Sequence, residues 1–103
     1  ALERYFVLKR EHSGEYRFAE HDLLIIGDKL LNKQQARAAV SFFEASLREY
    51  PVSRYDFYTN FKLAQAHQRL GETYLAESGC RKALELNPEF EPAALLLDEL
   101  TQP

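Results

Sequence analysis

The stretch from Leu63 to Pro88 limits most strongly what this chain can fold into. Its apolar residues recur at helical spacing in two runs, the first ending at Leu70 and the second beginning at Ala76. Gly71 separates the two runs, and the proline ends the second. The stretch therefore predicts two amphipathic helices that are joined by a glycine-centred turn and form an antiparallel hairpin.

The same pattern occurs once more, earlier in the chain. Pro51 and Pro88 are 37 residues apart (88 − 51), and this offset aligns large residues with apolar ones and small with small. The aligned pairs are Ile26 with Leu63, Gly27 with Ala64, Ala39 with Ala76, Phe43 with Cys80, Ser46 with Ala83 and Leu47 with Leu84. Because one hairpin cannot cover its own apolar face, this repeat predicts stacked helical hairpins.

The remaining sequence predicts helices on both sides of the repeat. Residues 2–11 have the pattern of a short helix, and an extended connector follows as far as residue 19. Ser53 and Asp56 have the spacing of a capping box, which predicts the start of a helix. Glu91, followed by a proline, has the pattern of an N-cap and predicts a last helix.

We therefore expect an all-α fold of about six helices in a single domain, 1–103. The expected parts are a leading helix and connector (1–19), a first repeat (20–53), a second repeat (54–90) and a closing helix (91–103). The expected core is formed by Leu23, Ile26, Val40, Phe43, Leu47, Leu63, Leu70, Ala76, Cys80 and Leu84.

The composition of the chain argues against some classes of binding partner. A net charge of −3 and a pI near 5.6 argue against nucleic acid, since phosphate binding needs clustered surplus Lys and Arg. The single cysteine, Cys80, excludes an internal disulfide and is expected to be a buried structural thiol. No membrane insertion is expected, because the sequence has no long apolar run and no signal peptide. The chain begins at Ala1 rather than Met, and we expect it to be a fragment of a longer protein.

No catalytic constellation is found in the sequence. No serine stands in a Gly-x-Ser-x-Gly or Ser-x-x-Lys motif. His12, His21 and His67 are too scattered for a helical metal pair, so no metal or other cofactor is expected. His67 lies on an apolar face, which favours a partly buried, hydrogen-bonded histidine over a ligand. Gly79, in the middle of a helix, favours close approach of a neighbouring helix. We do not expect an enzyme.

The repeated pattern resembles the tetratricopeptide repeat (TPR), a helical hairpin of about 34 residues. The matching positions are Leu63-Ala64, Gly71, Ala76, Cys80 and Ala83 to Pro88 in the later repeat, and Ile26-Gly27, Ala39, Phe43, Ser46-Leu47 and Pro51 in the earlier one. The departures are Leu23 and Asn60 for an expected aromatic, Leu30 and His67 for the usual tyrosine, Gln34 for the turn glycine, and three extra residues near Pro51–Asp56. The resemblance covers about residues 20–90 and implies a right-handed stack with a protein-interaction function.

A narrower likeness is to the TPR tails of bacterial serine hydrolases, which are β-lactamase-like enzymes or α/β-hydrolase esterases. The residues that carry it are Tyr16, Phe18, Glu20, Leu23, Gly27, Leu30-Leu31, Ala39-Val40, Phe43 and Tyr50-Pro51-Val52-Ser53. In such tails the Pro-x-Ser run leads directly into the next helix, whereas three inserted residues follow it here. This likeness would place the domain in the periplasm; without it the cytoplasm is the default.

The TPR resemblance implies that the first helix of each hairpin lines a concave face that binds a peptide or protein. Carried over position by position, that face comprises His21, Leu24, Asp28, Leu31 and Asn32 from the earlier repeat and Tyr58, Phe61, Gln65, Gln68 and Arg69 from the later. The alternative is that these are ordinary exposed positions or are covered by residues 1–19. The Lys/Asn/Arg set with which some TPRs clamp a terminal carboxylate is not reproduced.

Two classes of function remain open. The first is a non-catalytic interaction module that binds a peptide or protein partner. The second is a structural appendage that packs on a parent serine hydrolase or on a second copy of the chain. The run Leu95-Leu96-Leu97 motivates the second, because one of the three leucines must face outward on a helix.

Overall fold

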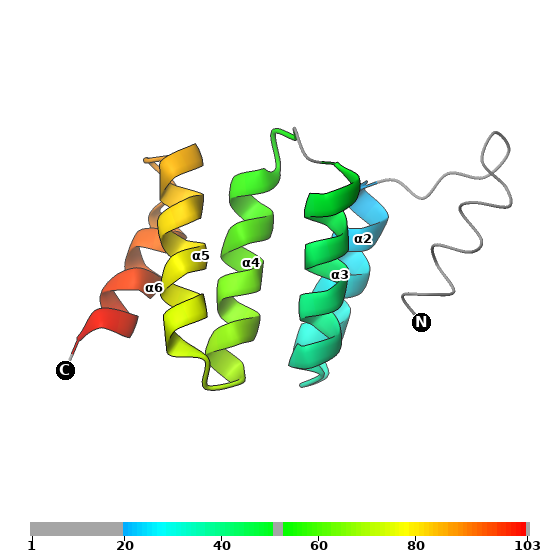
Figure 1. The fold of residues 1–103 in the computed structure, drawn as a ribbon, viewed down its shortest axis with the longest axis horizontal. Helices are drawn as coiled ribbons and strands as arrows, with labels where there is room; N and C mark the ends of the chain where they lie inside the picture. Colours follow the sequence, from blue (N-terminus) through cyan, green and yellow to red (C-terminus); the bar gives the residue numbers. More distant parts are fainter. Residues whose placement is uncertain (1–19, 51–52, 103) are drawn as a thin grey trace, which may run out of the picture.

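The structure is a computed structural model, and it describes residues 20–50 and 53–102. Within these ranges it contains five α-helices and no strand (Figure 1). They are α2 (Glu20–Asn32), α3 (Ala36–Glu49), α4 (Asp56–Arg69), α5 (Thr73–Leu86) and α6 (Glu91–Thr101). The predicted all-α fold is confirmed there, with five described helices rather than six. The helix predicted over 2–11 and the connector after it lie outside the described residues.

The helix boundaries repeat along the chain. α3 begins at Ala36 and ends at Glu49, and adding 37 to both numbers gives Thr73 and Leu86, the bounds of α5. The last residues of α2 and α4, numbers 32 and 69, are also 37 apart. The duplicated hairpin predicted from the sequence is therefore present as α2–α3 and α4–α5.

The two hairpin turns have the same backbone hydrogen bonds although their residues differ. Gly71 has a φ of 76° and its counterpart Gln34 a φ of 61°, so both lie in the left-handed region. In each turn, one hydrogen bond reaches back across the left-handed residue to the preceding helix. Gln35 N–H donates to Leu30 O at 2.8 Å, and Glu72 N–H donates to His67 O at 2.9 Å. This helix ending prefers glycine, which has no Cβ to clash in the left-handed region. Gln34 therefore occupies a strained position.

Glycines let the two helices of each hairpin come close together. A Cβ added to Gly27 in α2 would lie 2.5 Å from a ring carbon of Phe43 in α3. One added to Gly79 in α5 would lie 2.9 Å from the backbone oxygen of Asn60 and 3.0 Å from Cβ of Ala64, both in α4. The close helix approach predicted for Gly79 is confirmed, and Gly27 shows the same close approach.

The core is divided between neighbouring groups of helices. One buried cluster joins α2, α3 and α4, and another joins α4, α5 and α6. Of the predicted core residues, those that are buried are Leu23, Val40, Phe43, Leu63, Ala76 and Cys80. The prediction is wrong for Ile26, Leu47, Leu70 and Leu84, which are half-buried and pack against the clusters from their edges. A narrow stack of helices has few positions that neighbours enclose on every side.

The helices follow one another along an elongated body of 50 × 26 × 17 Å. Each helix packs on its neighbours in the sequence, and α2 also contacts α4 directly. In Figure 1, α2 lies behind α3, and α6 lies behind α5. The first helices of the two hairpins therefore share a face of the molecule.

Two helix starts differ slightly from their predicted positions. α4 begins at Asp56 and its N-cap is Tyr55, not the predicted Ser53. One hydrogen bond of the predicted capping box is nevertheless present, because Ser53 N–H donates to Asp56 Oδ2 at 3.3 Å. The N-cap of α6 is Phe90, so the prediction of Glu91 at that position is wrong by one residue. Helix ends commonly shift by a residue or two, because the first turn has few bonds to fix it.

The strained turn residue can be tested by exchanging residue types between the two turns. Gln34→Gly is expected to raise the free energy of unfolding by about 0.5 kcal/mol, because the Cβ penalty of the left-handed backbone outweighs the entropy cost of glycine. Gly71→Ala is expected to lower it by about 1 kcal/mol, although no atom lies within 4 Å of the added Cβ. Urea unfolding measures both changes, and shifts of the same sign would contradict this account of the turns.

Candidate functional site

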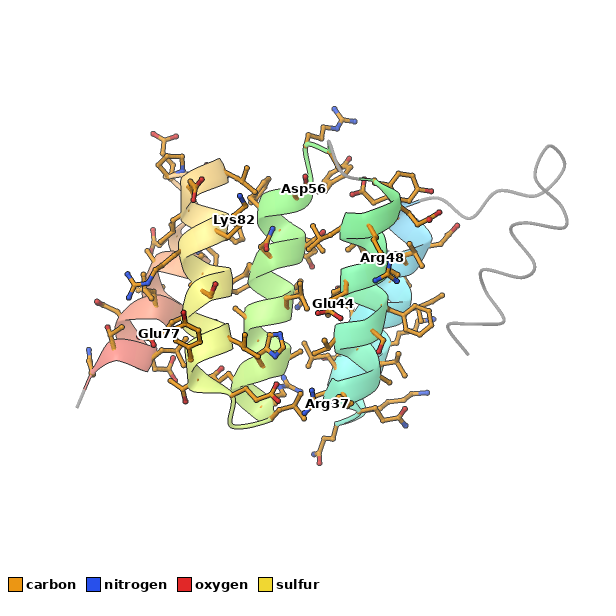
Figure 2. All side chains as sticks on the ribbon, viewed as in Figure 1. Arg37, Glu44, Arg48, Asp56, Glu77 and Lys82 are labelled. Carbon is orange, nitrogen blue, oxygen red and sulfur yellow. The ribbon has the colours of Figure 1, made fainter. Side chains whose placement is uncertain are left out.

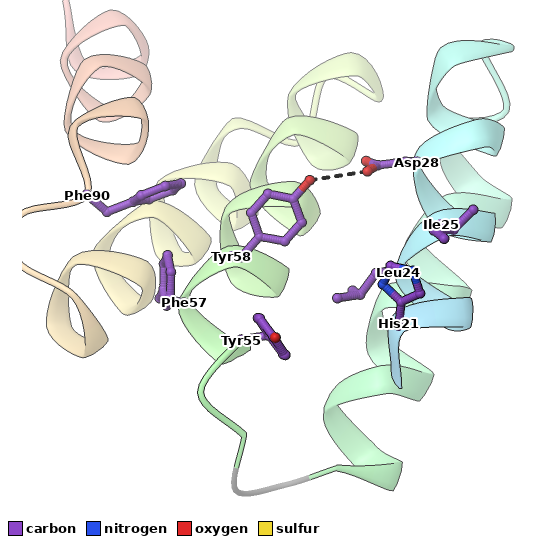
Figure 3. Close-up of a pocket in the computed structure, with 8 residues that line it drawn as sticks. All are labelled: His21, Leu24, Ile25, Asp28, Tyr55, Phe57, Tyr58 and Phe90. Carbon is purple, nitrogen blue, oxygen red and sulfur yellow. Dashed lines mark hydrogen bonds between the residues drawn. The ribbon is translucent and has the colours of Figure 1, made fainter. Parts of the chain in front are cut away.

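An open groove lies between the first parts of α2 and α4 (Figure 3). Its volume is about 450 Å³, and most of its wall is apolar. It is lined by His21, Leu24, Ile25 and Asp28 from α2, by Tyr55, Phe57 and Tyr58 at the start of α4, and by Phe90 just before α6. Ligand sites typically combine a volume of a few hundred Å³ with apolar walls and a few polar groups. This groove is therefore the candidate site.

Helical spacing accounts for the α2 wall of the groove. Residues 21, 24, 25 and 28 are spaced i, i+3, i+4 and i+7, so their side chains lie on one face of the helix. Leu24 is only 8% exposed and belongs to the core, whereas Ile25 is 39% exposed. On the opposite wall Tyr55 is 44% exposed. Ile25 and Tyr55 therefore offer the apolar surface that a ligand can cover.

Three phenylalanine rings fix the far wall of the groove. Phe57 and Phe61 are one helical turn apart in α4, and their ring centroids lie 5.0 and 5.2 Å from that of Phe90. Both pairs are close to perpendicular, at 72° and 84°. Edge-to-face pairs of this kind contribute about 0.5–1.5 kcal/mol each beyond burial. They hold the start of α6 against α4, so that Phe90 forms part of the groove.

A polar bridge crosses the groove from α4 to α2. The Tyr58 hydroxyl donates to Asp28 Oδ2 at 3.2 Å, and Lys62 Nζ lies 2.9 Å from Asp28 Oδ1. Burial first, and then the adjacent Asp28 carboxylate, raise the pKa of Tyr58 above its ordinary 10.0. The hydroxyl therefore stays protonated at neutral pH and keeps its donor role, while Lys62 balances the Asp28 charge.

The structure brings together only part of the predicted concave face. The predicted residues that line the groove are His21, Leu24, Asp28 and Tyr58. Leu31 and Phe61 are 1% and 9% exposed, so their predicted place on an open surface is wrong. Both pack in the hydrophobic clusters, because neighbouring helices cover the sides of α2 and α4 on which they lie.

The other predicted site residues lie outside the groove. Arg69 donates from Nη1 to the backbone oxygen of Leu31 at 2.6 Å, which links the ends of α4 and α2. Asn32 is exposed at the end of α2, and Gln65 and Gln68 are half-buried along α4. Whether residues 1–19 cover the face lies outside the described part of the chain.

Sequence reasoning missed half of the residues that line the groove: Ile25, Tyr55, Phe57 and Phe90. A signal for two of them is present in the density of aromatic residues between Tyr55 and Phe61. Ile25 shares the helix face of His21 and Leu24, so helical spacing alone could have found it. Phe90 has no local signal, because the packing of α6 against α4 brings it to the groove.

A cluster of charged side chains connects the turn between α4 and α5 to the start of α3. His67 Nδ1 lies 2.8 Å from Glu72 Oε1, and Arg37 Nη2 donates to Glu72 Oε2 at 2.9 Å. The hydrogen bond from His67, followed by that from Arg37, lowers the pKa of Glu72. Arg37 lies at the start of α3 (Figure 2), so the carboxylate joins the second turn to the first hairpin. The predicted partly buried, hydrogen-bonded His67 is confirmed by its 12% exposed side chain.

The only cysteine is inert in the folded chain. Cys80 is fully buried, as predicted, and burial raises the pKa of its thiol to about 11. Among the residues that the structure describes, no group of three or more His, Cys, Asp or Glu could hold a metal ion. In the same residues, no helix combines the length and apolar character needed to span a membrane.

These features define an all-helical protein that is built from a repeated hairpin and has an apolar groove across its first helices. Comparisons with protein-family models, curated proteins and solved structures found no match to the chain. Its function is therefore argued from the residues of the groove themselves.

The buried thiol gives the protein a distinctive alkaline pH dependence. The folded pKa of Cys80, about 11, lies above its ordinary 9.0, so the stability it contributes is complete below pH 9 and is lost as the pH rises towards 11. From pH 8 to pH 10 the wild type is expected to lose about 1 kcal/mol more than Cys80→Ala. Urea unfolding at both pH values measures this difference. Tyr58 is present in both proteins, so its ionisation cancels, and equal losses would contradict the burial argument.

Proposed function

We propose that this chain is a non-catalytic interaction module of the TPR kind, a right-handed stack of hairpins whose groove binds a peptide or protein segment. The repeat supports this proposal. Gly27 and Ala64 supply the small residue of each first helix, and Gln34 and Gly71 supply the left-handed residue of each turn. α6 follows the second hairpin as α4 follows the first.

The observation that carries the binding proposal is a wall of large apolar side chains that the described part of the chain leaves half covered. Ile25 and Tyr55 are 39% and 44% exposed and face the same groove. Large hydrophobic residues that are exposed together mark interaction sites, whereas single scattered ones are common on any protein surface. Tyrosine is enriched at interfaces, since its ring buries apolar surface while its hydroxyl keeps a polar partner.

The groove is also held in shape before any ligand arrives. The Tyr58–Asp28 bond links α4 to α2, and the ring pairs of Phe90 link α6 to α4. A preformed site loses less conformational freedom on binding, which leaves more of the contact energy for affinity. This favours recognition of an external segment over a surface that orders only on binding.

A second candidate function is a structural appendage that packs on a parent enzyme domain or on a second copy. It is favoured by the last helix, where Leu95 is 60% exposed while Leu96 is 7% exposed. The predicted outward leucine is thus present, and Leu86 nearby in the sequence is 47% exposed. A concentration-dependent mass in light scattering, abolished by Leu95→Asp, would favour this second function over the first.

Titration of a peptide library against the chain tests the groove. Ligands found in this way are expected to bind at least about tenfold more weakly to Ile25→Ala/Tyr55→Ala, because each exposed anchor contributes about 1–2 kcal/mol. The matched control is Leu75→Ala/Tyr74→Ala on α5, which removes side chains that are 46% and 80% exposed but do not line the groove. Circular dichroism checks that both variants fold. Absence of any ligand, or equal losses in both variants, would contradict the proposal.

A further inference from the structure

The mouth of the groove carries more acidic than basic side chains. The parts that meet there are the first turns of α2, α4 and α6, the last turn of α3, and segments 53–55 and 87–90 (Figure 1). Their acidic residues are Glu20, Asp22, Glu49, Asp56, Glu89 and Glu91, and their basic residues are Arg48 and Arg54. At the end of α5, Glu85 lies 3.9 Å from Lys82, so these two opposite charges cancel. Figure 2 shows Asp56 and Arg48 towards this end of the molecule and Arg37 towards the other. Among the residues that the structure describes, these six carboxylates and two guanidinium groups leave an excess of four negative charges.

Helix dipoles account for only a small part of this excess. Acidic side chains in a first turn stabilise a helix, since each N-terminus carries about +0.5 charge and each C-terminus about −0.5. Among the described helices, α2, α4 and α6 begin at this end, whereas α3 and α5 end there. The dipoles therefore sum to about +0.5, which is small beside four negative charges.

Two of the carboxylates are linked through Ser53 to Tyr55, which lines the groove. Glu20 Oε1 accepts a hydrogen bond from Ser53 Oγ at 2.7 Å, and Asp56 Oδ2 accepts one from Ser53 N–H at 3.3 Å. Ser53 Oγ in turn accepts from the N–H of Tyr55, which lines the groove, at 3.0 Å. The remaining oxygens, Glu20 Oε2 and Asp56 Oδ1, are buried and have no hydrogen-bond partner. Charge held in this way is screened less by salt than an exposed charge.

The nearby cations do not make the groove a site for an anionic ligand. The Arg54 guanidinium lies over the Tyr55 ring at 5.3 Å from its centre. Lys62 Nζ lies 2.9 Å from Asp28 Oδ1 and is only 17% exposed. Lys62 is paired with Asp28, Arg54 is not among the residues that line the groove, and the surrounding charge repels an anionic ligand.

We infer that the groove binds an apolar segment that carries a lysine or arginine next to its apolar side chains. This inference rests on the proposed function and adds the chemistry of the ligand. The apolar side chains pack against Ile25, Tyr55 and Phe57, and the cation lies towards Glu89 and Glu91 at the mouth. Charge of one sign around an apolar groove raises the rate of association with the complementary partner and excludes like-charged ones.

Three synthetic peptides of equal length, followed by fluorescence anisotropy, test the inference on the full chain. One alternates leucine with lysine, the second leucine with glutamate, and the third serine with lysine. The leucine–lysine peptide is expected to bind at least about tenfold more tightly than either of the others at low salt, and to weaken as salt is added.

A matched pair of charge variants locates the effect. Glu89→Gln/Glu91→Gln is expected to weaken binding of the leucine–lysine peptide by about threefold or more, because two ion pairs near the surface are lost. Asp98→Asn/Glu99→Gln makes the same charge change at the opposite, exposed end of α6 and is expected to leave the affinity unchanged.

The possible results separate this inference from the proposed function. Equal or tighter binding of the leucine–glutamate peptide, lost in Ile25→Ala/Tyr55→Ala, would overturn the charge preference and leave the groove as the binding site. Equal binding of the serine–lysine peptide would also overturn it, and so would equal effects of the two charge variants. Either result would mean that positive charge is attracted to the acidic chain as a whole and not to the groove. No binding of either leucine peptide would overturn both proposals.

Discussion

The close approach of the two helices within each hairpin is the contact on which the rest of this structure depends. Glycine in the interior of a helix costs about 1 kcal/mol relative to alanine, so Gly27 and Gly79 need a compensating gain. At Gly27 that gain is the fully buried ring of Phe43, which occupies the space that a Cβ would take. At Gly79 it is backbone-level contact with α4. The glycine lies on the first helix in one hairpin and on the second helix in the other.

The groove is a product of the stacking of these hairpins, since no single helix contains it. Once the first helices share a face, contacts between the units define its walls. The Tyr58 hydroxyl joins α4 to Asp28 in α2, Ser53 joins the start of α4 to Glu20, and Phe90 brings the start of α6 to α4. Half-exposed apolar surface is left between these contacts, with an excess of carboxylates at the mouth of the groove. Recognition of a partner is therefore the role that this arrangement supports best.

Helical spacing and the repeated pattern are enough to predict the five described helices, because amphipathic periodicity and turn residues are local properties of the sequence. They also predict a glycine-centred turn at Gly71, but not that Gln34 adopts the same left-handed backbone, since its side chain disfavours it. The site was predicted less well. Spacing gives the face of a helix but not how deeply a neighbour covers it, so Leu31 was placed on the surface although it is buried. Phe90 reaches the groove through a contact between helices, which no local pattern encodes.

The central claim is that residue sizes across the contact between the two helices of a hairpin compensate each other. In the first hairpin Gly27 faces the large Phe43. At the corresponding positions of the second hairpin, Ala64 shares a cluster with the smaller Cys80. Urea unfolding of Gly27→Ala, Phe43→Cys and the double variant measures this directly. Gly27→Ala is expected to lower the free energy of unfolding by about 1–3 kcal/mol in the wild type, and to cost little when Phe43→Cys has already made room. An equal cost in both backgrounds would contradict the claim.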